Sequence, residues 1–238
     1  MKKMLLLCTG LFLAAGIASA SPVTSENIVG YKKYTGAESG YTILTPNFVK
    51  VQGANQSFQL KNIMGNFTRG DSLQSMNLQG NVSGEAFWMT SPQVTIAGWY
   101  DEERNPLGDL EIDAGTAFFV LTALDNEFYV AGQVENENVV VNCDEGLNLI
   151  GNSSPVDLKF EDFAFDGVVR GDSIQFIDES GSVYTEAFWM TSPQVTTAGW
   201  YDEERTPLGK EIIPSGLGFF FLCQNDDVKV TIPAPILN

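Results

Sequence analysis

The chain has 238 residues and a formal net charge of −17, from 30 acidic and 13 basic side chains, and it contains no histidine. This acidity disfavours binding to nucleic acid or anionic lipid, which carry charge of the same sign. The lack of histidine excludes histidine-based triads and zinc–histidine sites, and an apolar content of 44% argues against disorder.

The first twenty residues have the pattern of a secretory signal peptide. Lys2 and Lys3 form a positive start, residues 5–17 are apolar, and Ala18-Ser19-Ala20 is a small-x-small cleavage site. The apolar run is too short for a stable membrane span. We therefore expect residues 1–20 to be removed, with no membrane span left, and the mature chain to lie in the periplasm, at the cell surface or outside the cell.

Two segments of the chain are nearly identical. Residues 85–108 (EAFWMTSPQVTIAGWYDEERNPLG) and residues 186–209 agree at 22 of 24 positions, at an offset of 101, and weaker similarity extends in both directions. A repeat of this length indicates two tandem copies of one structural unit. We place the first unit at residues 21–133 and the second at residues 134–238.

The predicted elements are mostly short strands, rich in Val, Ile, Phe and Tyr and bounded by Gly, Pro, Asn and Asp. They are residues 28–34, 41–44, 117–122, 128–131, 139–141, 173–177, 218–222 and 228–232. The best helical candidates are one or two turns near residues 58–64 and 158–163. This pattern predicts an all-β fold of two tandem small units, each a β-sandwich or a partly open β-barrel.

A resemblance rests on several short motifs. A signal peptide is followed by the sequence ENIVGY at residues 26–31, then by GWYD at 98–101 and by Gly115-x-x-Phe118-Phe119. With these motifs the chain resembles a group of uncharacterised secreted two-unit β-repeat proteins of Gram-negative bacteria. The resemblance implies export and β architecture, and it brings no activity and no functional residues.

The repeated block contains the candidate binding residues, which are aromatic. They are Trp88, Trp99, Tyr100, Trp189, Trp200 and Tyr201. Neighbouring residues of a strand point to opposite faces, so adjacent rings such as Trp99 and Tyr100 either have both faces covered or expose a ring. An exposed ring would serve as a stacking platform for sugars or as a self-association contact.

Polar residues of the block also agree between the copies, from Gln93 to Arg104. Either both blocks contact the same kind of partner, or DNA was recently copied from one unit to the other. The acidic clusters include Asp101, Glu102, Asp202 and Glu203, which are candidate ligands for a hard cation or simply a solvated run of charge. The Arg-Gly-Asp sequences at 69–71 and 170–172 are expected to form turns.

Two cysteines, Cys143 and Cys223, remain after signal removal. Both lie in the second unit, so an oxidising compartment would allow one disulfide within that unit. No phosphate-binding loop or dinucleotide fingerprint occurs, and we expect neither catalysis nor a cofactor. The sequence therefore predicts an exported structural or protein-interaction module with a protein partner or self-association, and the alternative is a carbohydrate-binding protein.

Overall fold

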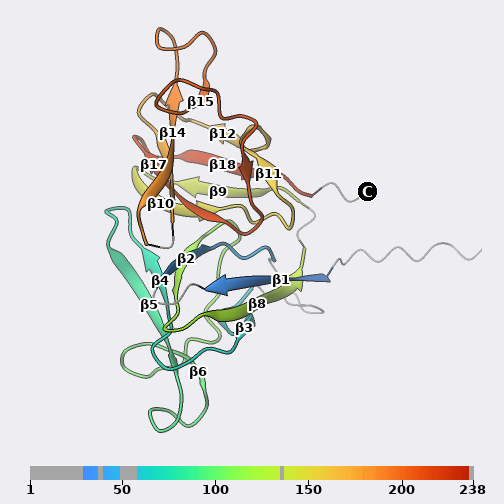
Figure 1. The fold of residues 1–238 in the computed structure, drawn as a ribbon, viewed down its shortest axis with the longest axis vertical. Helices are drawn as coiled ribbons and strands as arrows, with labels where there is room; N and C mark the ends of the chain where they lie inside the picture. Colours follow the sequence, from blue (N-terminus) through green and yellow to red (C-terminus); the bar gives the residue numbers. More distant parts are fainter. Residues whose placement is uncertain (1–28, 37–39, 49–57, 135–136, 179, 236–238) are drawn as a thin grey trace, which may run out of the picture.

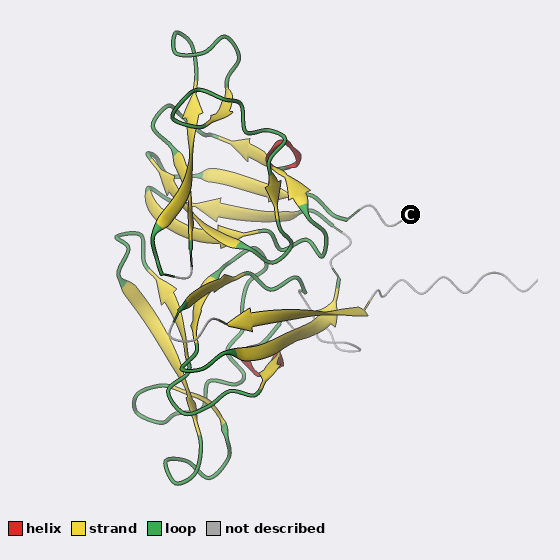
Figure 2. Cartoon of the chain, in the orientation of Figure 1, coloured by secondary structure: helices red, strands yellow, loops and turns green. Residues whose placement is uncertain are grey.

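The computed structural model describes residues 29–36, 40–48, 58–134, 137–178 and 180–235. The described chain is built of short antiparallel strands, which confirms the all-β prediction (Figures 1 and 2). Within these residues no helix is long and apolar enough to cross a membrane. The expected signal peptide at residues 1–20 lies outside the described residues.

The first eight strands form two sheets. They are β1 (Val29–Gly36), β2 (Tyr41–Leu44), β3 (Ile63–Gly65), β4 (Ser72–Met76), β5 (Val82–Met89), β6 (Gly98–Tyr100), β7 (Phe118–Leu121) and β8 (Asn126–Gln133). One sheet has the order β2-β7-β4-β5-β6 and the other has the order β1-β8-β3. A single 3-10 turn, Leu60–Asn62, precedes β3.

The remaining strands repeat this arrangement. They are β9 (Val139–Cys143), β10 (Gly146–Gly151), β11 (Leu158–Lys159), β12 (Ala164–Asp166), β13 (Ser173–Ile177), β14 (Val183–Met190), β15 (Gly199–Tyr201), β16 (Ile212–Ile213), β17 (Gly218–Cys223) and β18 (Val228–Ile232). The sheets β10-β17-β13-β14-β15 and β9-β18-β12 correspond to the two sheets above, and β11 pairs with β16. The second 3-10 turn is Phe160–Asp162. We call β1–β8 unit one and β9–β18 unit two, since every sheet takes its strands from one side of residue 134.

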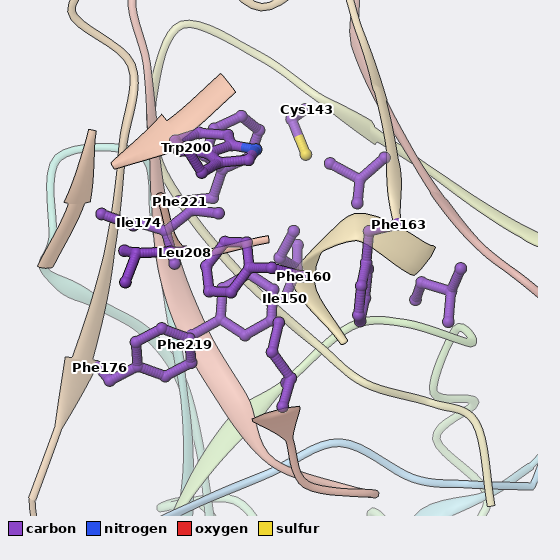
Figure 3. Packing of buried hydrophobic residues seen from close by; sticks show 14 of the residues in the cluster. Cys143, Ile150, Phe160, Phe163, Ile174, Phe176, Trp200, Leu208, Phe219 and Phe221 are labelled. Carbon is purple, nitrogen blue, oxygen red and sulfur yellow. The ribbon is translucent and has the colours of Figure 1, made fainter. Parts of the chain in front are cut away.

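A hydrophobic core fills the space between the two sheets of each unit. In unit one, Leu73 and Val120 of the five-stranded sheet pack in one cluster with Phe128 and Val130 of the three-stranded sheet. In unit two the cluster includes the rings of Phe160, Phe176, Phe219 and Phe221 (Figure 3). Each unit is therefore a sandwich of separate facing sheets, which decides between the two architectures that the sequence left open.

The predicted elements agree well with the structure. Residues 41–44, 173–177 and 228–232 are strands with those bounds, and the other predicted strands differ by one to a few residues at their ends. Both helical candidates are single 3-10 turns.

The two units pack through the outer faces of their five-stranded sheets. Ile43, Ala117 and Phe119 of unit one form one buried cluster with Leu149 and Phe220 of unit two. The rings of Phe119 and Phe220, which are equivalent residues of the repeat, lie 5.7 Å apart. A residue that contacts its own equivalent lies near an axis of approximate two-fold symmetry.

Backbone hydrogen bonds across the interface follow the same symmetry. Thr45 donates to the carbonyl of Gly216, and its counterpart Gly151 donates to the carbonyl of Gly115, both at 3.0 Å. The side chain of Asn47 is buried at the interface, where its amide donates to the Asn152 and Ser154 carbonyls at 3.2 and 2.7 Å. The arrangement resembles a symmetric dimer joined in one chain.

Candidate functional site

The near-identical block forms a hairpin at each end of the molecule. In unit one it comprises most of β5, the loop 90–97, β6 and the turn 101–106, and in unit two it comprises most of β14, the loop 191–198, β15 and the turn 202–207. The hairpins β5–β6 and β14–β15 point to opposite ends of the longest axis (Figure 1). We call loop 90–97 with turn 101–106 tip one, and loop 191–198 with turn 202–207 tip two.

Each hairpin is fixed to its core by a pair of tryptophans. Trp88 lies opposite Trp99 on β5 and β6, with ring centroids 5.1 Å apart, and Trp189 lies opposite Trp200 at 5.3 Å. Trp99 is 2% exposed and Trp200 is 7% exposed. The faces of these two rings are therefore packed against the protein core and cannot stack on a sugar. The residues left as candidates for sugar stacking are the half-buried Trp88, Trp189 and Tyr100, together with the edges of the buried rings.

The tyrosine that follows each buried tryptophan holds the loop in place. The Tyr100 hydroxyl donates to the carbonyl of Ile96 at 2.8 Å, and the Tyr201 hydroxyl donates to the carbonyl of Thr197 at 2.7 Å. The same bond in both copies gives the loops the same fixed shape. These tyrosines hold the loops of the tips through hydrogen bonds from within the structure, and Tyr201 is itself buried.

The predicted acidic clusters build turns. The Asp101 carboxylate accepts hydrogen bonds from the backbone and the side-chain amide of Asn105 at 2.7 and 2.8 Å, and these bonds lower the pKa of Asp101. Asp202 accepts a bond from the backbone of Thr206 at 2.7 Å. Glu102 and Glu203 are exposed beside them. The described residues contain no group of three or more acidic or sulfur side chains that could hold a metal ion.

The surfaces of both tips share most of their exposed side chains. In tip one the shared ones are Ser91, Pro92, Thr95, Glu102, Glu103 and Arg104, and each has an identical counterpart in tip two. The tips differ at two exposed positions, Ile96 against Thr197 and Asn105 against Thr206. Neither Arg104 nor Arg205 takes part in the ion pairs found among the described residues. Both arginines have a positive φ, 68° and 67°, which turns the chain sharply after the glutamates.

A pocket lies behind tip one. It has a volume of about 450 Å3 and is lined by Trp88, Trp99, Tyr100, Lys61 and Met64 among others. The indole N–H of Trp99 is buried without a hydrogen-bond partner in the described structure, and the same holds for Trp200. Buried donors normally find a partner. This pocket is where the candidate aromatic residues of unit one come together.

The two cysteines are neighbours in the core of unit two. Both are buried free thiols, and the hydrogen bond to Cys143, together with burial, raises the pKa of the Cys223 thiol (Figure 3 shows Cys143). Their contact agrees with the expectation that a bridge would lie within one unit. The disulfide itself stays a prediction.

The Arg-Gly-Asp sequences are turns whose acid points inward. Asp71 and Asp172 are 1% and 0% exposed. Asp71 accepts hydrogen bonds from the backbone of Thr68 at 2.7 Å and of Ala123 at 2.8 Å, and Asp172 has the equivalent pair. The turn interpretation therefore accounts for both copies.

Comparison with protein-family models, with curated proteins and with solved structures finds no significant match to this chain.

Two features of the structure were missed at the sequence level. The first is the interface amide of Asn47, for which the sequence has no signal. The second is a cavity of unit one that contains Ser75, where the repeat has Phe176 in unit two. An alignment of the two copies does contain a signal for this cavity, because it aligns the small polar Ser75 with the large ring of Phe176.

Proposed function

We propose that this chain is an exported, non-enzymatic structural protein that bridges partners at the cell envelope or outside the cell. The observation that supports this is the position of the near-identical block, which forms two equal tips at opposite ends of the molecule (Figure 1). A rigid body with nearly the same surface at both ends can hold two copies of one partner.

Packing explains only part of the identity between the blocks. Ala86, Trp99 and Leu107 and their counterparts belong to or pack against the cores. The exposed Glu102, Glu103 and Arg104 contact no core, and exposed side chains usually tolerate substitution. A shared partner supplies a physical reason for their agreement, whereas recent copying of DNA leaves their agreement without a structural reason.

The geometry favours a bridge between two separate partners over the binding of both tips to one partner surface. The buried interface between the units holds the tips apart, so they face away from each other. Two equal sites on one rigid body give avidity only when the targets lie at matching positions. Sites at opposite ends instead link separate molecules into chains.

A second copy of this chain is the partner that we test first. Each tip presents two glutamates beside an arginine, Glu102, Glu103 and Arg104 in tip one. Two such surfaces related by a two-fold axis can place each arginine against the other's glutamates, which is the self-complementary arrangement of a symmetric contact. Because each molecule has two tips, such contacts generate an open chain of molecules.

The experiment compares three charge-neutralising variants of residues 21–238 by light scattering over a wide concentration range. Glu102→Gln, Glu103→Gln and Arg104→Asn together alter tip one, Glu203→Gln, Glu204→Gln and Arg205→Asn together alter tip two, and the third variant combines them. We expect the unaltered protein to grow beyond a dimer, either single-tip variant to stop at a dimer, and the combined variant to stay monomeric. Growth that is equal in all four proteins would refute the tip contact.

The pocket behind tip one favours a second candidate function, carbohydrate binding. Trp88, Trp99 and Tyr100 line it together with Lys61. Apolar rings beside a charged donor suit a sugar, which has both apolar and hydroxyl faces. A glycan panel with the unaltered protein and with Trp88→Ala tests it. Binding that Trp88→Ala removes supports this alternative, and the absence of any binding sugar eliminates it.

A further inference from the structure

Unit one contains a second cavity, separate from the pocket behind tip one, whose lining includes Asp101 of tip one. Its volume is about 460 Å3, within the range of small-molecule sites. Its interior is apolar and lies at the edge of the core, where it is lined by Leu60, Leu73, Ala86, Leu107, Ile112 and Phe118.

The cavity corresponds to the position of a phenylalanine ring in unit two. Ser75 of β4 lines it, and the equivalent residue of β13 is Phe176; both precede the same irregularity in the pairing of the strands. Phe176 is 6% exposed, and its ring lies 6.0 Å from Phe160 and 5.4 Å from Phe219 (Figure 3). The counterparts of these two rings, Leu60 and Phe118, line the cavity of unit one.

A second difference lies next to the first. Tyr184 of unit two lies 6.2 Å from the Phe176 ring, and its counterpart in unit one is Ser83. The hydroxyls of Ser75 and Ser83 lie 3.2 Å apart. Two large rings in one copy are thus replaced by two small hydroxyls in the other, directly before a block of almost identical sequence.

The cavity has a negative rim. Glu85, Asp101, Glu111 and Asp113 contribute to its lining, and no Lys or Arg is found among the described residues that line it. The Gln74 side chain donates to the Glu85 carboxylate at 2.6 Å and so fixes its position. Glu111 and Asp113 are exposed at the mouth. An apolar interior favours an apolar body, and this rim attracts a cation and repels an anion.

We propose that unit one binds a small organic ammonium ion with an apolar body in this cavity. The apolar part fills the space that Phe176 occupies in unit two, and the ammonium group lies among the carboxylates of the rim. The site shares Asp101 with tip one, but its lining does not include Glu102, Glu103 or Arg104, so its test is independent of the test of the bridging function.

The test uses two probes that share one apolar body and differ in charge. 2-Phenylethylammonium is the cation, and 3-phenylpropionate is the matched anion. Binding to residues 21–238 is measured by titration calorimetry and by saturation-transfer NMR. We expect the cation to bind at least tenfold more tightly than the anion, and its affinity to fall with added salt because the rim is exposed to solvent.

Two variants locate the binding. Ser75→Phe places the ring of unit two into the cavity of unit one, and it should reduce the affinity for the cation at least tenfold while the circular dichroism spectrum stays unchanged. Glu111→Gln with Asp113→Asn removes two exposed charges of the rim and should weaken the cation several-fold with little effect on the anion. If Ser75→Phe does not fold, this second variant alone tests whether the cation binds in the cavity.

Several results would overturn the proposal. These are no measurable binding of 2-phenylethylammonium, equal affinity for the two probes, and an affinity for the cation that survives Ser75→Phe in a folded protein. If Ser75→Phe fails to fold, an affinity unchanged by the rim variant has the same meaning.

Discussion

At the scale of single residues, the position of Ser75 in unit one and Phe176 in unit two is packed differently in the two units. Phe176 packs among aromatic rings, and Ser75 at the same place leaves a cavity. A large apolar side chain removed from a packed core costs both its transfer free energy and the cavity that remains. The two units therefore respond differently to exchanges at this one position.

Exchange of the two residues gives the first stability prediction. Phe176→Ser should lower the free energy of unfolding by about 3–5 kcal/mol, the range for loss of a buried phenylalanine side chain. Ser75→Phe should change it much less, or raise it, because the cavity accepts the ring. Urea denaturation followed by tryptophan fluorescence measures both, and equal losses from both exchanges would contradict the assigned equivalence.

Tyr34 gives a pH prediction at the same scale. Burial raises the pKa of Tyr34 above its usual value of 10.0. The unfolded chain then releases this proton at a lower pH than the folded chain does, so the stability is fully present below pH 10 and is lost as the pH rises further. The urea midpoint should fall less steeply above pH 10 in Tyr34→Phe than in the unaltered protein. Tyr184→Phe, at a more exposed tyrosine whose pKa is also raised by burial, provides the comparison, and we expect it to have the smaller effect.

At the scale of elements, one carboxylate in each unit joins two parts of a sheet. Asp71 accepts backbone hydrogen bonds from the turn before β4 and from the residues after β7, and Asp172 does the same for β13 and β17. The backbone carbonyl of each aspartate also accepts a hydrogen bond from the backbone N–H of a tryptophan on the next strand, Trp88 in unit one and Trp189 in unit two. The turn thus fixes the position of the hairpin that carries the tip.

Replacement of this carboxylate by an amide should destabilise the unit. Asp71→Asn loses the charge and offers one acceptor oxygen to two buried N–H donors, which should cost about 1–3 kcal/mol of unfolding free energy. Asp109→Asn is the matched control, since the Asp109 side chain is 84% exposed and pairs with Lys61 at the surface. A loss in Asp71→Asn no greater than in the control would show that the buried bonds contribute little.

The sequence predicted most of the elements because their signals are local. Strands such as 41–44 and 228–232 consist of β-branched and aromatic residues, and the Arg-Gly-Asp turns follow from glycine and aspartate chemistry. The burial of Trp99 and the inward direction of Asp71 depend on contacts between residues distant in the chain. The same is true of the face-to-face packing of the sheets, for which strand patterns have no signal. For that reason the sequence pattern predicts the aromatic rings and the acidic clusters as candidate sites, although most of these side chains build the hairpin.

At the scale of the whole molecule, the interface between the units sets the distance and direction of the tips. Phe119 and Phe220 form its apolar centre, and Asn47 donates hydrogen bonds across it. The Tyr34 hydroxyl donates to the Asn47 side-chain oxygen and holds the amide in place. Bridging by the two tips requires this interface to be rigid.

Asn47→Ala should weaken the interface specifically. Two carbonyls of unit two, those of Asn152 and Ser154, lose their donor, and a loss of about 1–3 kcal/mol is expected. The two units should then unfold in two separate calorimetric transitions, where the unaltered protein shows one. A single transition of unchanged midpoint would mean that the apolar cluster alone holds the units together.

The most direct test of the bridging function is the solution mass of residues 21–238 measured by light scattering against concentration, for the unaltered protein and for one altered tip. We expect a mass that grows past the dimer for the unaltered protein and stops at the dimer when Glu102 and Glu103 are changed to glutamine and Arg104 to asparagine. A monomer at every concentration, or the same growth with and without the altered tip, would contradict it.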